Sequence, residues 1–180
     1  MIEKTAIVKN ANIAASAYIG DYCIIGAAPE KIGVYPDSPF PVEIGEGTQI
    51  TGLCTIDSGV KRRTVIGRNC FIMKQTHIGH CAQIGDNVTI APHATIGGGV
   101  TIGEGCNIGM GAAIHPNISI PPYCMVGMNA VITKGQEIKP FSVMVGNPSR
   151  WLRFNQRAIE KHGLTPEQVT EIQEDWLNNH

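Results

Sequence analysis

The chain carries an aliphatic residue at every sixth position over a long central stretch, from Thr64 to Met144. The series reads Ile66, Ile72, Ile78, Ile84, Ile90, Ile96, Ile102, Ile108, Ile114, Ile120, Val126, Ile132, Ile138 and Met144. Two positions before nearly every member stands a small or β-branched residue, and Gln136 is the exception. A period of six is neither the 3.6 of a helix nor the two of a long strand, so it indicates an internal repeat.

Each six-residue unit is expected to form a short strand followed by a turn. The aliphatic residue and the residue two before it share one strand face, which would point inward. A glycine often follows the aliphatic residue, as at Gly79 and Gly97, and would bend the chain toward the next side. Three such sides make one coil, and coils would stack at roughly 4.7–4.9 Å. The pattern therefore predicts an all-β triangular solenoid, in which each buried isoleucine contributes roughly 1.5–3 kcal/mol.

The same rhythm begins near the N-terminus and is interrupted twice. Its earlier members are Ile7, Ile13, Ile19, Ile25, Ile44, Ile50 and Ile56. Residues 27–41 are rich in proline and predict a projecting loop. Residues 57–63 form a second insertion, which carries the basic triplet Lys61, Arg62 and Arg63. Insertions in a repeat array gather on one face and often build a binding site, although exposed charges of this kind are also typical of plain surface loops. We therefore expect a β-helix domain over residues 1–148 with projecting loops at 27–41 and 57–63.

The last part of the chain, residues 149–180, predicts a short α-helical tail. A first helix is expected from Asn155 to His162, ended by Gly163. The segment Thr165-Pro166-Glu167-Gln168 offers an N-cap, a proline at the first helical position and a capping-box glutamine. The second helix should run through Trp176. The two helices would cover open edge strands of the solenoid, whose unpaired backbone groups otherwise invite aggregation.

Composition restricts the class of protein further. A length of 180 residues suits one domain, and a net charge of −1 gives no electrostatic reason to expect nucleic acid or an anionic membrane as partner. Without a long apolar run or a secretory leader, the expected location is the cytoplasm. Five of the six cysteines fall at inward small-residue positions and are expected to be buried thiols. No paired cysteine spacing indicates a zinc site.

Candidate chemistry lies where polar residues depart from the repeat. His77 and His80 are both off the inward positions. One coil after His80 comes Gly98, inside the run Gly97-Gly98-Gly99, so a bare glycine should stack directly over the imidazole. An imidazole beside an accessible backbone N–H provides the base and the oxyanion donor that acyl transfer needs. Two coils after Gly79 comes His115, which should lie at the same corner.

The hexapeptide rhythm, the His77-x-x-His80 segment and the glycines in register with it resemble one family over nearly the whole chain. That family comprises the UDP-N-acetylglucosamine O-acyltransferases of lipid A synthesis and the related nucleotide-amino-sugar N-acyltransferases. The resemblance implies a left-handed parallel β-helix and a homotrimer with active sites between subunits. It implies that His80 is the catalytic base, that Gly98 supplies the oxyanion donor, and that His77 and His115 contact the substrate.

The resemblance also assigns residues nearer the C-terminus. Asn147, Asn155, Lys161 and His162 match positions that help to bind the nucleotide sugar or the acyl donor, and Met128 matches the position that measures the acyl chain. The implied co-substrate is acyl-CoA or acyl carrier protein, with no permanently bound cofactor and no metal.

Two departures from the family pattern shape the expected substrate. Cys81 stands where the lipid A enzymes carry an aspartate that supports the imidazole, so another group must orient His80, and an amine acceptor is favoured over a hydroxyl. The bulky Met128 and the short helical tail favour a short acyl group carried by CoA. The preferred interpretation is therefore transfer of a short acyl group, such as acetyl, from acyl-CoA to a nucleotide-linked amino sugar.

Three alternatives remain open from the sequence. The first is a UDP-N-acetylglucosamine O-acyltransferase that uses acyl carrier protein. The second is a gamma-type carbonic anhydrase, whose fold is the same and whose three histidines share one metal; the Cys106–Ile114 stretch is similar to hexapeptide proteins of both kinds. The third is a non-catalytic assembly module built on the same solenoid.

Overall fold

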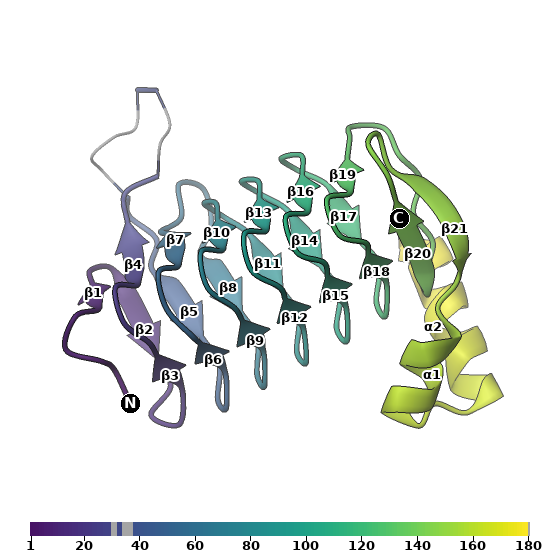
Figure 1. Ribbon diagram of the computed structural model, residues 1–180, viewed down its shortest axis with the longest axis horizontal. Coiled ribbons are helices and arrows are strands. Elements are labelled where there is room, and N and C mark those ends of the chain that lie inside the picture. Colours follow the sequence, from purple (N-terminus) through teal and green to yellow (C-terminus); the bar gives the residue numbers. More distant parts are fainter. Residues whose placement is uncertain (30–31, 34–37, 180) are drawn as a thin grey trace.

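The computed structural model describes residues 1–29, 32–33 and 38–179, and these residues form a triangular β-solenoid with two helices at its C-terminal end (Figure 1). Part of the loop expected at residues 27–41, namely 30–31 and 34–37, lies outside the described residues. The all-β class with a short helical tail is confirmed. Neither of the helices in the described residues has the length and apolar character needed to cross a membrane.

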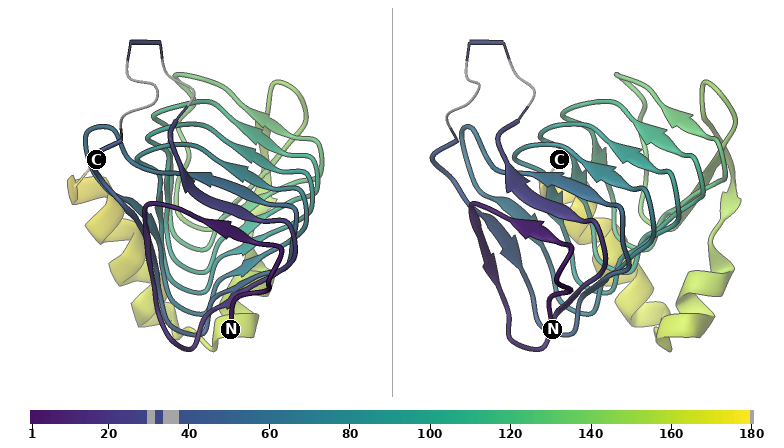
Figure 2. Two further views of the ribbon diagram at one scale, coloured as in Figure 1. Left: turned by 90° about the vertical axis from the view of Figure 1, so that its left-hand side faces the viewer. Right: turned by 60° about the vertical axis from the view of Figure 1, so that its left-hand side comes forward.

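The described strands form three sheets, one for each side of the triangle (Figure 2). The first sheet contains β1 (Ile7–Val8), β4 (Ile24–Ala27), β7 (Thr55–Asp57), β10 (His77–Ile78), β13 (Thr95–Ile96), β16 (Ala113–Ile114) and β19 (Val131–Ile132). The second contains β2 (Ala11–Ile13), β5 (Val42–Ile44), β8 (Thr64–Ile66), β11 (Gln83–Ile84), β14 (Thr101–Ile102) and β17 (Ser119–Ile120). The third contains β3 (Tyr18–Ile19), β6 (Gln49–Ile50), β9 (Phe71–Ile72), β12 (Thr89–Ile90), β15 (Asn107–Ile108), β18 (Met125–Val126), β20 (Ser142–Val145) and β21 (Arg150–Phe154).

Strands of successive coils pair in parallel, and the aliphatic column is their common register. Ile78 of β10 lies opposite Ile96 of β13, and Ile84 of β11 lies opposite Ile102 of β14. The repeated isoleucines and the small residues before them are buried in one continuous core, as the sequence predicts. All six cysteines, each within the described residues, are buried free thiols.

The glycine that follows the aliphatic residue has a different role from the one expected. The sequence suggested that its conformational freedom bends the chain. Instead, the left-handed backbone conformation falls two residues later, for example at Cys81 (φ 62°) and Gly99 (φ 73°). Gly79 is needed because a Cβ there would lie 2.8 Å from the backbone nitrogen of Gly98 in the next coil. Close stacking of coils, and not the turn itself, therefore excludes a side chain at this position.

The two insertions meet at one corner of the solenoid. The Gly59 N–H donates to the Phe40 carbonyl at 2.7 Å, and the Ser38 hydroxyl donates to the Gly59 carbonyl at 2.8 Å. Phe40 and Gly59 form an antiparallel bridge. The described ends of the two inserted segments thus support each other on the same face, as expected for insertions in a repeat array.

The C-terminal segment begins with a strand that the sequence did not reveal. β21 pairs antiparallel with β20 and so covers the edge of the third sheet. The two helices were expected to cover open edge strands, but at this edge of the third sheet the partner of β20 is β21. The order Arg150-Trp151-Leu152-Arg153 does not alternate between apolar and polar residues, so it gives no strand signal, and every residue of β21 is exposed.

The two helices follow β21 and agree with the sequence expectation. α1 spans Gln156–His162 and ends at Gly163 in the left-handed conformation, and α2 spans Pro166–Asn179. The capping box is present, because the Gln168 N–H donates to the Thr165 hydroxyl and the Thr165 N–H donates to the Gln168 side-chain oxygen. The helices pack on a second apolar cluster formed by Tyr123, Phe141 and Ala158.

His162 ties the end of α1 to this cluster and should make its docking sensitive to pH. Its ring meets Tyr123 edge-on, and its Nε2 is buried without a hydrogen-bond partner among the described residues. Burial, assisted by the charge of Lys161 and opposed by Glu104, lowers the pKa of His162. The unfolded chain therefore binds a proton at His162 more readily than the folded chain does. The stability that neutral His162 contributes is fully present above its ordinary pKa of 6.5, and it is lost as the pH falls through the lower pKa of the folded state.

We therefore expect the melting temperature of the wild-type protein to fall between pH 7 and pH 5 more steeply than that of His162→Phe. Phenylalanine keeps the ring packing and removes the group that must be protonated. Thermal unfolding followed by the fluorescence of Trp151 and Trp176 at each pH measures the difference. Identical pH slopes for the two proteins would show that His162 does not couple protonation to folding.

Candidate active site

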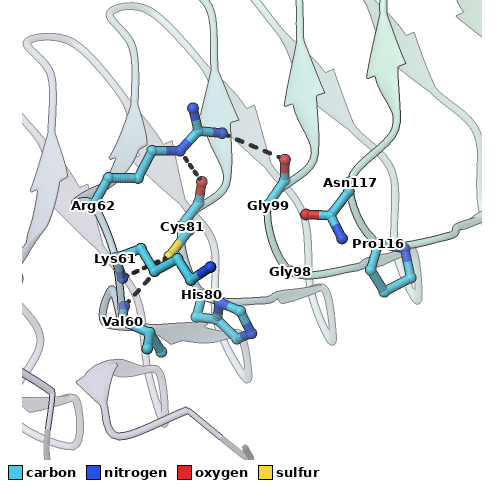
Figure 3. A pocket seen from close by; sticks show the side chains of 9 residues that line it. All are labelled: Val60, Lys61, Arg62, His80, Cys81, Gly98, Gly99, Pro116 and Asn117. Atoms are coloured by element: carbon cyan, nitrogen blue, oxygen red, sulfur yellow. Dashed lines mark hydrogen bonds between the residues drawn. The ribbon is translucent and has the colours of Figure 1, made fainter.

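His80 and Gly98 occupy one corner of the solenoid in successive coils. His80 follows β10 directly after Gly79, and Gly98 holds the equivalent place after β13. A Cβ built on Gly98 would lie 2.7 Å from His80 Nε2, so the imidazole fills the space that a side chain at position 98 would take (Figure 3). The stacking expected from the eighteen-residue spacing is therefore present in the structure.

The backbone around Gly98 leaves one amide available. The Gly99 N–H donates to the His80 carbonyl at 2.7 Å, and the Gly98 carbonyl accepts from the Asn117 N–H at 2.9 Å. Among the described residues, no acceptor is assigned to the N–H of Gly98. An uncommitted amide beside an imidazole Nε2 can stabilise negative charge that develops on a reacting carbonyl oxygen.

An open cavity of about 680 Å³ surrounds this pair. Its lining consists of Val60, Lys61, Arg62, His80, Cys81, Gly98, Gly99, Pro116 and Asn117. The described lining therefore comes from the 57–63 insertion on one side and from three successive coils on the other (Figure 3). It contains two cationic side chains and no acidic one.

His77 points outward from β10 and is held by two residues of the coil below. Its Nδ1 lies 2.8 Å from the Thr55 hydroxyl, and its Nε2 lies 4.0 Å from Asp57 Oδ2. Asp57 is only 8% exposed. If the Thr55 hydroxyl donates to Nδ1, the proton of the neutral ring is on Nε2 and faces the carboxylate, which is the favourable arrangement.

Asp57 is a buried polar neighbour of His77 that the sequence did not single out. Its position in the repeat could have pointed to it. Asp57 directly follows the inward Ile56, at the place where many other repeats have glycine. The insertion after Ile56 concealed this relation, because it places His77 twenty-two residues after its partner Thr55 instead of eighteen.

Cys81 turns its sulfur away from the imidazole and toward the 57–63 insertion. Its Sγ accepts from the N–H groups of Val60 at 3.3 Å and Lys61 at 3.4 Å. Burial of this thiol raises its pKa, but the backbone amides of residues 60–62 and the Arg62 charge outweigh burial, and the net pKa is lowered. Cys81 therefore fastens the insertion to the corner that carries His80.

Seven other residues singled out from the sequence do not line this cavity within one chain. These are His77, His115, Met128, Asn147, Asn155, Lys161 and His162. His115 and Asn147 are exposed, Met128 is 69% exposed, and Lys161 is exposed in the last turn of α1. The Asn155 side chain is buried and donates to the Tyr123 carbonyl at 2.8 Å. His162 packs on Tyr123, as described above.

The described part of the chain contains no set of side chains arranged to bind a metal ion. No group of three or more His, Cys, Asp or Glu side chains there is placed to hold one ion. His77 and Asp57 provide only two such groups, and His77 already contacts the Thr55 hydroxyl.

Comparison with known proteins shows which proteins this chain is similar to. Residues 63–98 match the family described as bacterial transferase hexapeptide (six repeats). The acyl-[acyl-carrier-protein]–UDP-N-acetylglucosamine O-acyltransferase of Burkholderia thailandensis is 26% identical over 157 residues, which are 86% of this chain and 59% of the relative. The enzyme of the same name from Campylobacter concisus is 36% identical over 88 residues, 44% of this chain and 34% of the relative. The resemblance is to the hexapeptide-repeat acyltransferases.

Solved structures agree on the fold. The UDP-N-acetylglucosamine acyltransferase of Bacteroides fragilis superimposes with a TM-score of 0.86 at 21% identity, covering 97% of this chain and 69% of that one. WeeI from Acinetobacter baumannii gives a TM-score of 0.56 at 34% identity, covering 62% of this chain and 52% of that one. The solenoid is a left-handed parallel β-helix. The chain spans less than two thirds of the length of the Burkholderia relative.

The contact between Gly98 and His80 predicts the effect of one methyl group. In Gly98→Ala, the new Cβ would clash with the imidazole, while the backbone amide stays in place. Gly98 is outside the left-handed region, and the ring can swing into the open cavity, so the melting temperature should change little. A role for His80 in acyl transfer predicts that turnover in a thiol-release assay falls by about 100-fold, the cost of misplacing a reacting group by roughly 1 Å.

The double variant His80→Ala/Gly98→Ala provides the control. If the methyl group acts by displacing the imidazole, it costs nothing further once the imidazole is absent, and the two effects are strongly non-additive. Full additivity would mean that Gly98 acts independently of His80.

Proposed function

We propose that this protein is an acyltransferase that moves a short acyl group from acyl-CoA to an amine on a nucleotide-linked sugar. The observation that supports the proposal most directly is the position of His80 Nε2 against Gly98, beside an uncommitted amide in an open cavity. The similarity to enzymes named as UDP-N-acetylglucosamine O-acyltransferases supports the class of acceptor.

In the proposed reaction, His80 Nε2 takes a proton from the acceptor amine or hydroxyl while the nitrogen or oxygen of that group attacks the thioester carbonyl carbon. The carbonyl electrons move to oxygen, and the N–H of Gly98 donates a hydrogen bond to the resulting oxyanion. When the tetrahedral intermediate collapses, the carbon–sulfur bond breaks. The imidazolium then returns its proton to the leaving thiolate, which restores neutral His80.

The proposal for a short acyl group and an amine acceptor rests on features of this chain. Cys81 gives its sulfur to the insertion and not to the imidazole, so it does not provide the carboxylate support that a hydroxyl acceptor would favour. Met128 places a thioether at the position matched to the acyl-length residue. O-acylation with acyl carrier protein as donor, the activity named for the Burkholderia and Campylobacter relatives, is the alternative.

The remaining site residues are assigned within a homotrimer. We propose that His77 contacts the sugar, while Asp57 and Thr55 hold the imidazole ring of His77 in place. His115, Asn147 and Lys161 are exposed outside the cavity of their own chain, so a neighbouring subunit would be required to bring such groups to it. Asn155 and His162 have their polar atoms or rings packed against Tyr123, and we assign them to holding α1 in place. The predicted mass in solution is that of three chains, which light scattering after size exclusion measures.

Replacing the proposed base should abolish most of the activity. We expect His80→Ala to reduce turnover of acetyl-CoA with UDP- or dTDP-linked amino sugars by at least about 100-fold, the lower end of the contribution of a general base. Thiol release measures the rate, and mass spectrometry of the sugar product separates amide from ester.

His115→Ala is a matched control, because it removes an exposed imidazole at the same corner that does not line the cavity within one chain. It should affect the KM for the sugar more than kcat. Wild-type turnover in His80→Ala would remove His80 from the role of base. Absence of transfer to any acceptor in the wild-type protein would favour a non-catalytic module.

Met128 should limit the length of the acyl chain. In Met128→Gly, removal of the thioether opens space along the outer corner, and we expect longer acyl-CoA donors to be accepted, with kcat/KM for acetyl-CoA changed little. Competition between acetyl-CoA and decanoyl-CoA in one reaction measures the preference. An unchanged preference would show that Met128 does not line the acyl site.

A further inference from the structure

The basic triplet of the second insertion is divided between two surfaces. Arg63 turns toward the second sheet and pairs with Glu43 at 3.1 Å. Lys61 and Arg62 turn the other way and line the cavity beside His80 (Figure 3). All three cations are exposed, but two of them line the cavity of the candidate active site and the third does not.

Arg62 is held in a defined place on the cavity wall. Its Nε donates to the Cys81 carbonyl at 3.1 Å, and its Nη2 donates to the Gly99 carbonyl at 3.4 Å. Cys81 and Gly99 occupy equivalent positions in successive coils, so the guanidinium bridges two coils (Figure 3). A guanidinium has five N–H donors, and these two bonds leave three for another acceptor.

The insertion that carries Lys61 is held as well. The Lys61 N–H and the Val60 N–H both donate to Cys81 Sγ, which fixes the backbone of Lys61 next to the corner of His80. The ammonium group itself extends on a flexible side chain into the cavity opening. A fixed guanidinium and an adjustable ammonium are therefore placed side by side.

These charges are not neutralised by neighbouring acids in the part of the chain that the structure describes. No carboxylate there forms an ion pair with Lys61 or Arg62, and the cavity lining contains no acidic side chain. Such a site attracts a polyanion with oxygens at more than one position.

We propose that Lys61 and Arg62 bind the diphosphate of the nucleotide sugar. The inference rests on the proposed function and names the group by which this cavity would select its acceptor. The planar guanidinium suits two oxygens of one phosphate, and the ammonium acts as a point charge toward the other.

The same chemistry occurs in a second possible source, because coenzyme A also contains a diphosphate. Connectivity distinguishes the two. In a nucleotide sugar, a single sugar ring separates the acceptor group from the diphosphate. In coenzyme A, the whole pantetheine arm separates the thioester from it. Arg62 and His80 line the same cavity, and only the shorter connection, through one sugar ring, requires the diphosphate and the reacting group to share one cavity.

The test measures binding, without any acyl transfer, by isothermal titration calorimetry. The probes are inorganic pyrophosphate, UDP, dTDP and coenzyme A. We expect Arg62→Gln to weaken binding of pyrophosphate and of the nucleoside diphosphate by roughly 10–100-fold, the value of a charged hydrogen bond. Arg63→Gln is the matched control, since it removes the same charge one residue away on the other surface, and it should change binding less than about twofold.

Lys61→Gln tests the same site without removing a contact to the backbone, because no hydrogen bond of the Lys61 side chain holds the described structure together. We expect it to weaken pyrophosphate binding by about fivefold, and we expect raised salt to reduce the difference from the wild type. If Arg62→Gln unfolds, as its melting temperature would show, Lys61→Gln decides the question. Unchanged pyrophosphate affinity in Lys61→Gln overturns the proposal, as does an equal loss in Arg62→Gln and Arg63→Gln.

The coenzyme A measurements decide the source of the diphosphate. A loss of coenzyme A binding with unchanged nucleoside diphosphate binding in Arg62→Gln would assign the cations to the donor and overturn the proposal. The proposed function can fail separately. If no acyl transfer occurs but Arg62→Gln still loses pyrophosphate binding, the anion site stands and the acyltransferase assignment falls. If transfer depends on His80 while Arg62→Gln binds pyrophosphate normally, the reverse is true.

Discussion

The stacking of successive coils at backbone distance is the constraint on which the rest of this molecule depends. The inward isoleucines set the register, because Ile78, Ile96 and Ile114 lie directly over one another in the first sheet. At the corners the coils approach so closely that a Cβ at Gly79 would lie 2.8 Å from the Gly98 nitrogen. This closeness brings the side chain of His80 against an amide of the next coil. The candidate chemistry is therefore a direct consequence of how the core packs.

The site is completed where the repeat is interrupted. The 57–63 insertion begins at the buried residue Asp57. Its backbone then contacts the next coil, where the N–H groups of Val60 and Lys61 donate to Cys81 Sγ. In doing so the insertion adds the cations Lys61 and Arg62 to a corner where the coils themselves contribute no lysine or arginine to the described cavity lining. The solenoid places His80 and the Gly98 amide at rigid positions, and the insertion adds two cations beside them, an arrangement that favours precise placement of reacting atoms.

The C-terminal segment is attached through an aromatic cluster on the outside of the solenoid. Tyr123 stacks on Phe141 with ring centroids 5.3 Å apart, and its hydroxyl donates to Glu104 at 2.9 Å. Burial, together with this bond to a carboxylate, raises the pKa of Tyr123 to about 12. The phenol therefore remains a neutral donor across the physiological range. Tyr123 also joins the solenoid to α1, because the His162 ring meets it edge-on and the Asn155 side chain donates to its carbonyl.

The sequence by itself determined the features that follow from the period of six: the triangular coil, the inward columns, and the stacking of His80 against Gly98. It also determined the capping box of α2, because that motif is local. The tertiary structure alone decided the opposite directions of Arg62 and Arg63, the pairing of His77 with Asp57, and the strand β21. These features depend on insertions and on an antiparallel return, which break the eighteen-residue spacing. Once the spacing is broken, sequence separation no longer gives distance, and packing between segments decides which groups meet.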